Sequence, residues 1–396
     1  MFKNFDYYEP VQVVFGPGRL CEIGGLAEKI GKKALIVTTG SFFIELGLVG
    51  RIQKYLQDSG IASEVYSNVN PNPLSTQIDG GARFGHETGC DFLIGLGGGS
   101  AIDAAKGIAV AIGHDQPIWN FCPGKQERIQ EVTDKTLPIV AVTTTSGTGS
   151  HSTCFSVITN PMTQEKPGLG SPYIFPKFAV VDPELMISMP KKLTAATGFD
   201  VLAHAIEAYT SRQSTPFTDL MAEQALRLVG KYLTRACEKG DDIEARAGMA
   251  LADTYSGFSI AVAVVTLCHA ISHVIGGIYK TVHGETLAAL TPQTMRYSME
   301  YNREKFRNIG FFLRNESIIG LDGKVTTEDL ENSVKEVERI IADIGISASL
   351  KDEGVREEGF NKIAEETIAY MSIGVDLDAR LASIEDITEI LKASFK

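Results

Sequence analysis

Residues Gly95 to Ala111 read GLGGGSAIDAAKGIAVA, and this stretch decides the fold of the first half of the chain. The run DFLIGL, from Asp91 to Leu96, is short and apolar, which is typical of a buried strand. The residues from Ser100 to about Ile112 are typical of a helix. Consecutive glycines between them permit a tight turn and let backbone N–H groups approach a ligand. The stretch therefore predicts one strand–turn–helix unit of an α/β sheet.

The same alternation extends to both sides of this unit. Apolar runs at 33–39, 61–69 and 137–145 are predicted strands, and 42–59 has the apolar spacing of one amphipathic helix. Strands that alternate with helices indicate a mainly parallel, Rossmann-like sheet covered by helices.

The prolines divide the chain. Thirteen of the fifteen lie at or before Pro190, and only Pro216 and Pro292 follow. Because helix interiors exclude proline, the second half is predicted to be all-helical, with Thr218 to Gly240 as one clear helix. We expect an α/β dinucleotide-binding domain over 1–190 and a helical metal-binding, catalytic domain over 191–396.

Composition narrows the class of protein. The 396 residues carry a formal net charge of −12 and no marked basic run, which argues against nucleic-acid and anionic-membrane partners. Six scattered cysteines and a first segment, MFKNFDYYEP, without the apolar core of a signal peptide predict a cytoplasmic protein. Phe258 to Ile278 is long enough to span a bilayer, but its two histidines favour a helix buried in protein.

Two loops indicate a binding site for a dinucleotide. The helix after Gly97–Gly99 presents free N–H groups and its positive dipole end to an anion such as a pyrophosphate. Ser100 is a candidate cap, with Asp103 as its capping-box partner. A plain tight turn explains these glycines equally well, since the full G-x-G-x-x-G is missing. The hydroxyl-rich TTTSGTGS, Thr143 to Ser150, lies at the end of another strand, where α/β sheets bind ligands.

The predicted strand over 33–39 ends in Thr39, and Gly40 follows it. Neither residue supplies the carboxylate that usually accepts the adenine ribose hydroxyl and repels a 2′-phosphate. We therefore hypothesise that NADP(H) is tolerated as well as NAD(H), with the preference between them left open.

A second constellation indicates a metal. Asp200 and His204 are four residues apart, so on a helix they lie on one face. His269 and His283 follow within LCHAISHVIGGIYKTVHG, separated by a predicted break at Gly276–Gly277. Three imidazoles and one carboxylate suit Fe²⁺, Zn²⁺ or Mn²⁺. His273 is either a fifth ligand or a nearby proton carrier, and Glu207 is either a partner of a ligand or an exposed acid.

The motifs GGGSAIDAAK, TTTSGTGS, GFDVLAHAIEAY and HAISHVIGGIYKTVHG occur in an order that resembles the iron-containing (group III) alcohol dehydrogenases. The resemblance covers essentially the whole chain. It implies that Fe²⁺ is bound by Asp200, His204, His269 and His283, and that His273 serves proton transfer beside the nicotinamide. Because the usual order of affinities favours Zn²⁺ over Fe²⁺, Zn²⁺ is an alternative after purification. The resemblance also implies a cleft between the domains and the residues that line the cofactor: Asn72, Gly97, Gly98, Gly99, Ser100, Asp103, Thr144, Thr145, Thr148 and Lys166.

The activity implied is NAD(P)-dependent hydride transfer between nicotinamide and a small primary alcohol or aldehyde. The alternatives are a metal-dependent lyase of the dehydroquinate synthase and glycerol dehydrogenase superfamily, and a non-catalytic nucleotide-binding protein. Departures from the family pattern at His151, where glutamate is common, and at Ile260, Ala261, Val274 and Val282 bear on the substrate. The strand VQVVFG is a candidate for pairing with a second copy, so we expect a homodimer or a higher homo-oligomer.

Overall fold

A computed structural model of the chain describes residues 4–321 and 323–396, which form two compact units. The α/β unit comprises Glu9–Thr145 and Ser150–Met186. The helical unit comprises Ile187–Lys396, the segment that ends at Tyr8, and the short loop Ser146–Gly149. This loop belongs to the helical unit although the sequence analysis assigns it to the first domain.

Within the described residues, six parallel strands form one sheet in the order β1-β8-β5-β4-β2-β3. Its strands are β1 Gln12–Phe15, β2 Lys33–Thr39, β3 Ala62–Val69, β4 Phe92–Gly97, β5 Ile139–Thr143 and β8 Phe178–Val181. The order reverses between β2 and β4, because β3 lies on one side of β2 and the later strands on the other. Ligands of such sheets bind at this point, beyond the carboxyl ends of the strands. The predicted Rossmann-like sheet is confirmed.

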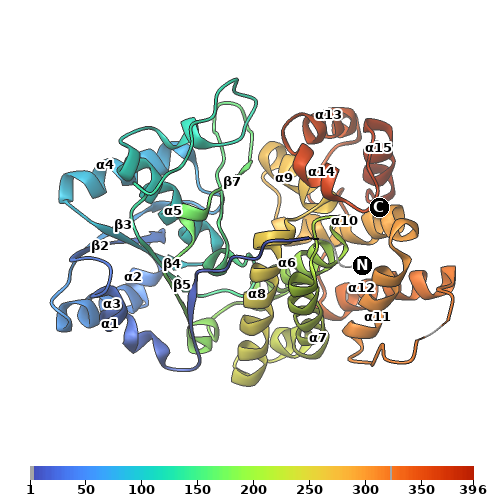
Figure 1. The fold of residues 1–396 in the computed structure, drawn as a ribbon, viewed down its shortest axis with the longest axis horizontal. Helices are drawn as coiled ribbons and strands as arrows, with labels where there is room; N and C mark the ends of the chain where they lie inside the picture. Colours follow the sequence, from blue (N-terminus) through green and yellow to red (C-terminus); the bar gives the residue numbers. More distant parts are fainter. Residues whose placement is uncertain (1–3, 322) are drawn as a thin grey trace. The chain divides into compact units, whose positions relative to one another are not determined.

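Alternate residues of the central strands cover the two faces of the sheet. Leu35, Val37 and Leu93 pack with residues of the helices α4 and α5. Their neighbours Ala34, Ile36 and Ile94 pack with residues of α1 and α3, on the opposite face (Figure 1). The helices of this unit are α1 Ile23–Ala27, α2 Phe42–Glu45, α3 Leu48–Asp58, α4 Ser75–Thr88 and α5 Gly99–His114.

Two local predictions in this unit are wrong. The single helix expected over 42–59 is two helices, α2 and α3, because Gly47 adopts a left-handed φ of 76° between them. The cap of α5 is Gly98 rather than Ser100, and no side chain caps it. Ser100 instead lies inside the first turn, so the capping-box prediction for Ser100 and Asp103 fails.

The strand expected to pair with another copy is β1, and it pairs in parallel with β8 of its own chain. It stands at one end of the strand order, so its other edge faces no strand among the described residues. A separate antiparallel pair, β6 Phe155–Val157 and β7 Gly168–Gly170, lies outside the main sheet.

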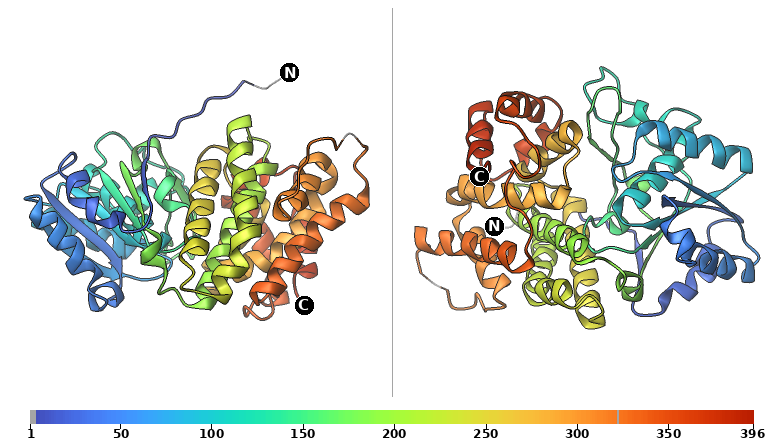
Figure 2. Two further views of the ribbon diagram at one scale, coloured as in Figure 1. Left: turned by 90° about the horizontal axis from the view of Figure 1, so that it is seen from below. Right: turned by 180° about the vertical axis from the view of Figure 1, so that it is seen from behind.

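The helical unit confirms the all-α prediction. In Figure 2 the long helices α6, α7 and α8 run side by side. The predicted helix over 218–240 is α7, which begins at Pro216 behind a Thr215 cap whose hydroxyl accepts from the Thr218 N–H. The helices are α6 Lys191–Thr210, α7 Pro216–Glu238, α8 Ile243–Ala263, α9 Leu267–Tyr279, α10 His283–Ser298, α11 Arg303–Leu313, α12 Thr327–Ile344, α13 Phe360–Tyr370, α14 Ser372–Leu377 and α15 Ile384–Ala393.

The apolar stretch 258–278 is not one buried helix. It contains the end of α8 and most of α9, whose axes differ by 99°. Across the parts of the chain that the structure describes, no single helix is long and apolar enough to cross a bilayer. At the bend, Val264 has φ 61° and ψ 167°, a backbone conformation that a β-branched residue rarely adopts.

The break between His269 and His283 also differs from the prediction. Helix α9 continues through Gly276 and Gly277 and ends at Tyr279, where Lys280 takes a left-handed φ of 57°. His283 is then the first residue of α10. The chain therefore reverses after the glycine pair rather than at it.

Candidate metal centre and nucleotide-binding edge

Three helices of the helical unit supply the predicted metal ligands. Asp200 and His204 lie one turn apart on α6, His269 lies in the first turn of α9, and His283 begins α10. Asp200, His204 and His269 are buried, and His283 is partly exposed. The predicted set therefore comes together although its members are spread over 84 positions of the sequence.

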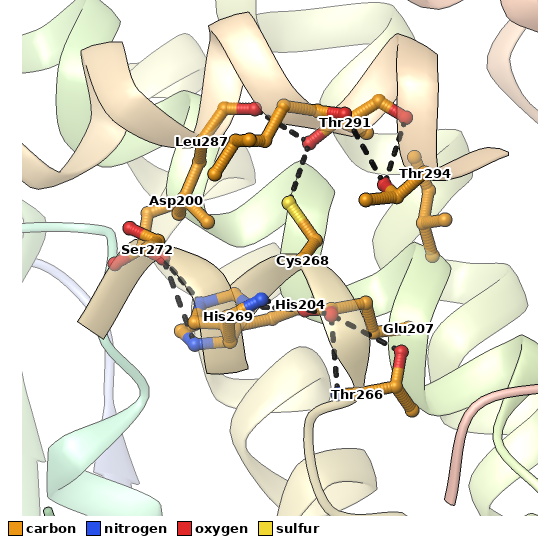
Figure 3. Close-up of polar contacts among 12 residues, drawn as sticks. Asp200, His204, Glu207, Thr266, Cys268, His269, Ser272, Leu287, Thr291 and Thr294 are labelled. Carbon is orange, nitrogen blue, oxygen red and sulfur yellow. Dashed lines mark hydrogen bonds and ion pairs between the residues drawn. The ribbon is translucent and has the colours of Figure 1, made fainter. Parts of the chain in front are cut away.

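The three imidazoles converge on one carboxylate oxygen, Asp200 Oδ1. The Nε2 atoms of His204, His269 and His283 lie 3.6, 3.3 and 3.7 Å from it. Ligand atoms of Asp200, His269 and His283 all lie within 4.8 Å of one another. His204 lies outside that mutual set but stacks on His269, with ring centroids 4.5 Å apart, as Figure 3 shows.

These distances fit a divalent cation. Four ligands placed tetrahedrally at about 2.0–2.2 Å from an ion lie about 3.3–3.6 Å from one another. Direct hydrogen bonds between these groups would instead be shorter, near 2.9 Å. His269 Nε2 is still within hydrogen-bond range of Asp200 Oδ1 at 3.3 Å, whereas the separations of 3.6 and 3.7 Å for His204 and His283 are longer than hydrogen bonds and fit groups arranged around a common centre.

Each imidazole is oriented through its other nitrogen. His204 Nδ1 donates to the Gly147 carbonyl oxygen at 3.2 Å, which fixes the proton on Nδ1 because a carbonyl can only accept. His283 Nδ1 lies 3.0 Å from the Ser272 hydroxyl, and His269 Nδ1 contacts the Glu207 carboxylate. Partners of this kind hold ligating histidines in the correct tautomer, with Nε2 free for the metal.

Glu207, left undecided by the sequence, is buried and serves the site. Besides His269 Nδ1, its carboxylate accepts from the backbone N–H groups of Thr266 and His269, each at 3.1 Å (Figure 3). Burial opposes both charges, yet mutual attraction outweighs it: the pKa of Glu207 is lowered and that of His269 is raised to about 9. For His204, burial dominates and lowers the pKa.

His273 lies close to the predicted histidine ligands. It is 7% exposed and follows His269 by one turn of α9. Its ring centroid is 6.0 Å from that of His269 and 5.5 Å from that of His283. It does not belong to the group of ligand atoms that includes Asp200, His269 and His283.

In the α/β unit, the predicted cofactor residues gather at the carboxyl ends of β2, β4 and β5. Thr39 ends β2, and Gly97–Ser100 joins β4 to α5. Thr144 follows β5, and its N–H donates to the Gly97 carbonyl at 3.0 Å. The N–H of Asn72, which has a left-handed φ of 57°, donates to the Ser100 hydroxyl at 3.2 Å. Thr145 also lies in this unit, whereas Thr148 belongs to the helical unit.

Asp103 and Lys166 are buried in the α/β unit. The two carboxylate oxygens of Asp103 accept from the Ser150 hydroxyl at 2.5 Å and from the Val157 N–H at 3.0 Å. Asp103 thus fastens α5 to the segment after the second loop.

Lys106, a neighbour of this carboxylate that the motifs did not indicate, is fully buried. Its ammonium donates to the carbonyl oxygens of Thr153 and Phe155 at 2.9 and 2.7 Å, and burial lowers its pKa to about 8. His151 is also buried, and burial lowers its pKa to about 3, so it is neutral at pH 7. The carbonyl partners of Lys106 are those of a structural residue. A lysine one turn after Asp103 was the signal available in the sequence.

Comparison with known proteins gives family matches for both parts of the chain, the part with the nucleotide-binding edge and the part with the predicted metal ligands. Residues 10–183 match the family model for iron-containing alcohol dehydrogenase, and residues 194–395 match the model for the C-terminal part of the Fe-containing alcohol dehydrogenase family. The chain is 37% identical to a 1,3-propanediol dehydrogenase of Klebsiella pneumoniae, over 100% of both chains. It is 33% identical to an NAD-dependent methanol dehydrogenase of Bacillus methanolicus, over 98% of this chain and 99% of the relative. A solved alcohol dehydrogenase from an archaeal, halo-thermophilic source in a Red Sea brine pool superposes with a TM-score of 0.95 at 37% identity, over 100% of both chains.

Proposed function

Because this chain belongs to the iron-containing alcohol dehydrogenase family, we propose that it transfers hydride between a nicotinamide cofactor and a small primary alcohol or aldehyde. The observation that carries this proposal is the convergence of His204, His269 and His283 on Asp200 Oδ1. A buried set of imidazoles around one carboxylate is costly unless a cation joins it. A cation held there can serve this reaction class as a Lewis acid.

Asp200, His204, His269 and His283 would hold Fe²⁺. When bound there, a divalent cation supplies Lewis acidity to an alcohol or carbonyl oxygen at neutral pH. The choice of iron rests on the family. Because the usual order of affinities places Zn²⁺ above Fe²⁺, protein purified in air is expected to carry zinc.

The residues of this chain have distinct tasks in the reaction. Glu207, Ser272 and the Gly147 carbonyl fix the three imidazoles, so no rearrangement of the ligands is needed during turnover. His273 would serve as the proton carrier of this chain, taking up the proton released from the alcohol and returning it in the reverse direction. A histidine suits this role because its usual pKa lies near neutral pH.

The α/β unit would hold the cofactor at the reversal of strand order. The N-terminus of α5, with Gly97 to Ser100 before and within its first turn, would bind the pyrophosphate. Asn72, Asp103, Thr144, Thr145, Thr148 and Lys166 complete the proposed cofactor set, with Asp103 and Lys166 acting from buried positions. Thr39 accepts the adenine ribose with or without a 2′-phosphate, so both NAD and NADP are proposed. The methanol dehydrogenase relative is named as NAD-dependent.

The proposed substrate is a short alcohol. Relatives are named for methanol and 1,3-propanediol. In the helical unit, Ile260 packs in an apolar cluster with Ala208 and Ala263. Ala208 follows Glu207 in the sequence, and Ala263 directly precedes the α8–α9 bend. Aliphatic surroundings favour alkyl chains over charged substrates.

We further propose a cytoplasmic homodimer. Within the described residues, strand β1 is one of the two edge strands of the sheet, and an edge strand is a ready partner for another chain.

One experiment tests the function. Protein purified without oxygen is assayed with a panel of short alcohols and aldehydes, with NADH and NADPH, with and without added Fe²⁺, and its metal content is measured. We expect turnover that follows iron content. A lyase of the related superfamily would convert its substrate without net change in nicotinamide absorbance. A non-catalytic nucleotide-binding protein would bind the cofactor and turn over nothing in the panel.

A further inference from the structure

The loop Ser146–Gly149 packs on the two helices next to the metal centre. A Cβ atom on Gly147 would lie 2.8 Å from the Thr197 Cβ of α6, which also carries Asp200 and His204. Gly149 has a left-handed φ of 62°, and a Cβ there would lie 2.7 Å from the Gly257 Cα of α8. Only glycines allow the backbone of this loop to approach both helices so closely.

One buried carboxylate holds this loop. Asp253 of α8 is 1% exposed and lies one turn before Gly257. Its Oδ1 accepts from the Gly149 N–H at 2.8 Å, and the Gly147 N–H also donates to its carboxylate. The side chain therefore binds the two glycines that touch the helices.

A carboxylate in this position is costly. Burial raises the pKa of Asp253 to about 7, against the lowering effect of the Gly147 and Gly149 N–H groups, and the nearby charge of Asp200 adds to the rise. A neutral amide would avoid this cost, but it has one acceptor oxygen where the carboxylate has two for the Gly147 and Gly149 N–H groups.

The hydrogen bonds lead from Asp253 to a metal ligand. Gly147 donates its N–H to Asp253, and its carbonyl oxygen accepts from His204 Nδ1 at 3.2 Å. The peptide units on either side of Gly147 are thus tied at one end to α8 and at the other to the imidazole on α6. Loss of the carboxylate would let the carbonyl turn away from His204.

We propose that Asp253 is a positioning residue for the metal centre: it fixes Gly147 and Gly149 and thereby sets the orientation of His204. This inference rests on the proposed function, since it assumes that the centre binds a divalent cation. It predicts that a side chain without contact to the ion controls metal affinity. Outer partners of ligating histidines typically contribute about 10–100-fold in affinity.

The test measures Co²⁺ binding to the metal-free full-length protein by competition with a chelator and records the visible d–d absorption of bound Co²⁺. The variants are Asp253→Ala and Asp253→Asn. The control is Ser256→Ala, which removes another fully buried polar side chain of α8, whose hydroxyl donates to the Asp253 backbone carbonyl. Circular dichroism and the melting temperature of the metal-free forms report folding.

We expect Asp253→Ala to weaken Co²⁺ binding at least about tenfold and to alter the absorption of the bound ion. Asp253→Asn should lose less Co²⁺ affinity than Asp253→Ala, because its amide oxygen still accepts from one N–H. Ser256→Ala should bind Co²⁺ as tightly as the wild type does. Equal affinity and equal spectra in wild type, Asp253→Asn and Ser256→Ala would overturn the inference, even if Asp253→Ala does not fold. Failure of the wild type itself to bind Co²⁺, Fe²⁺ or Zn²⁺ would instead contradict the proposed function.

Discussion

The Glu207 carboxylate contacts Nδ1 of His269, and Nε2 of the same ring lies 3.3 Å from Asp200 Oδ1. One imidazole thus connects two carboxylates of α6 that lie two turns apart. The inner carboxylate is placed to bind the ion, and the outer one orients the ring and increases its basicity.

Replacing Glu207 by Gln therefore has a defined consequence. The amide keeps the size of the side chain but loses the charge that favours the His269 tautomer with Nε2 free. We expect metal affinity to fall about 10–100-fold, measured by chelator competition. The matched control is Glu223→Gln, because Glu223 pairs with Arg227 on the surface of α7. Similar affinities in both variants would contradict the role given to Glu207.

His269 and His273 should separate metal binding from proton transfer. His269→Ala is expected to lose the metal. His273→Ala is expected to keep it and to lose about 10²–10⁴-fold in kcat. Metal content by plasma mass spectrometry and steady-state rates on the same samples provide the comparison. Equal loss of metal in both variants would make His273 a ligand instead.

Thr39 at the end of β2 tests the cofactor hypothesis. In Thr39→Asp a carboxylate would repel a 2′-phosphate and accept the ribose hydroxyl. We expect the ratio of kcat/KM for NADPH to that for NADH to fall by at least about tenfold, or about 1.4 kcal/mol. A wild-type enzyme that already rejects NADPH would refute the hypothesis before any variant is made.

Val264 at the α8–α9 bend predicts an unusual order of stabilities. Alanine normally exceeds glycine in stability by about 0.5–1 kcal/mol because it loses less backbone entropy. At φ 61° and ψ 167°, however, any Cβ is strained, at a cost of about 1–3 kcal/mol. Val264→Gly should therefore be more stable than Val264→Ala in urea unfolding. The usual order at this site would show that the bend carries no such strain.

His151 predicts a dependence of stability on pH. Its pKa is about 3 in the folded protein, against 6.5 ordinarily, so between these values the unfolded chain binds one proton more. The contribution of neutral His151 to the free energy of unfolding is complete above pH 6.5. It decreases as the pH falls towards 3, by at most about 1.4 kcal/mol per pH unit. The free energies of unfolding of wild type and His151→Gln, measured in urea at pH 7, 6 and 5, should converge as the pH falls. Parallel curves would mean that His151 titrates normally.

Much of the molecule could be predicted from the sequence because the signals are local. The apolar strands and the glycine turn after β4 define the sheet, and the scarcity of proline after Pro190 defines the helical half. The i, i+4 spacing of Asp200 and His204 already places both side chains on one face of a helix.

The errors have one physical cause. The apolar spacing over 42–59 continues past Gly47, although the helix does not. The apolar run over 258–278 likewise continues past the bend at Val264. In both segments tertiary packing decides where the backbone turns. Glu207 and Asp253 are ordinary helical acids in the sequence. Their partners, His269 and the loop glycines, come from distant segments that only the fold brings into contact. The sequence determined which atoms are available to bind a cation, whereas the tertiary structure decided which tautomer and orientation each would have, since hydrogen bonds over such separations exist only after the helices have packed.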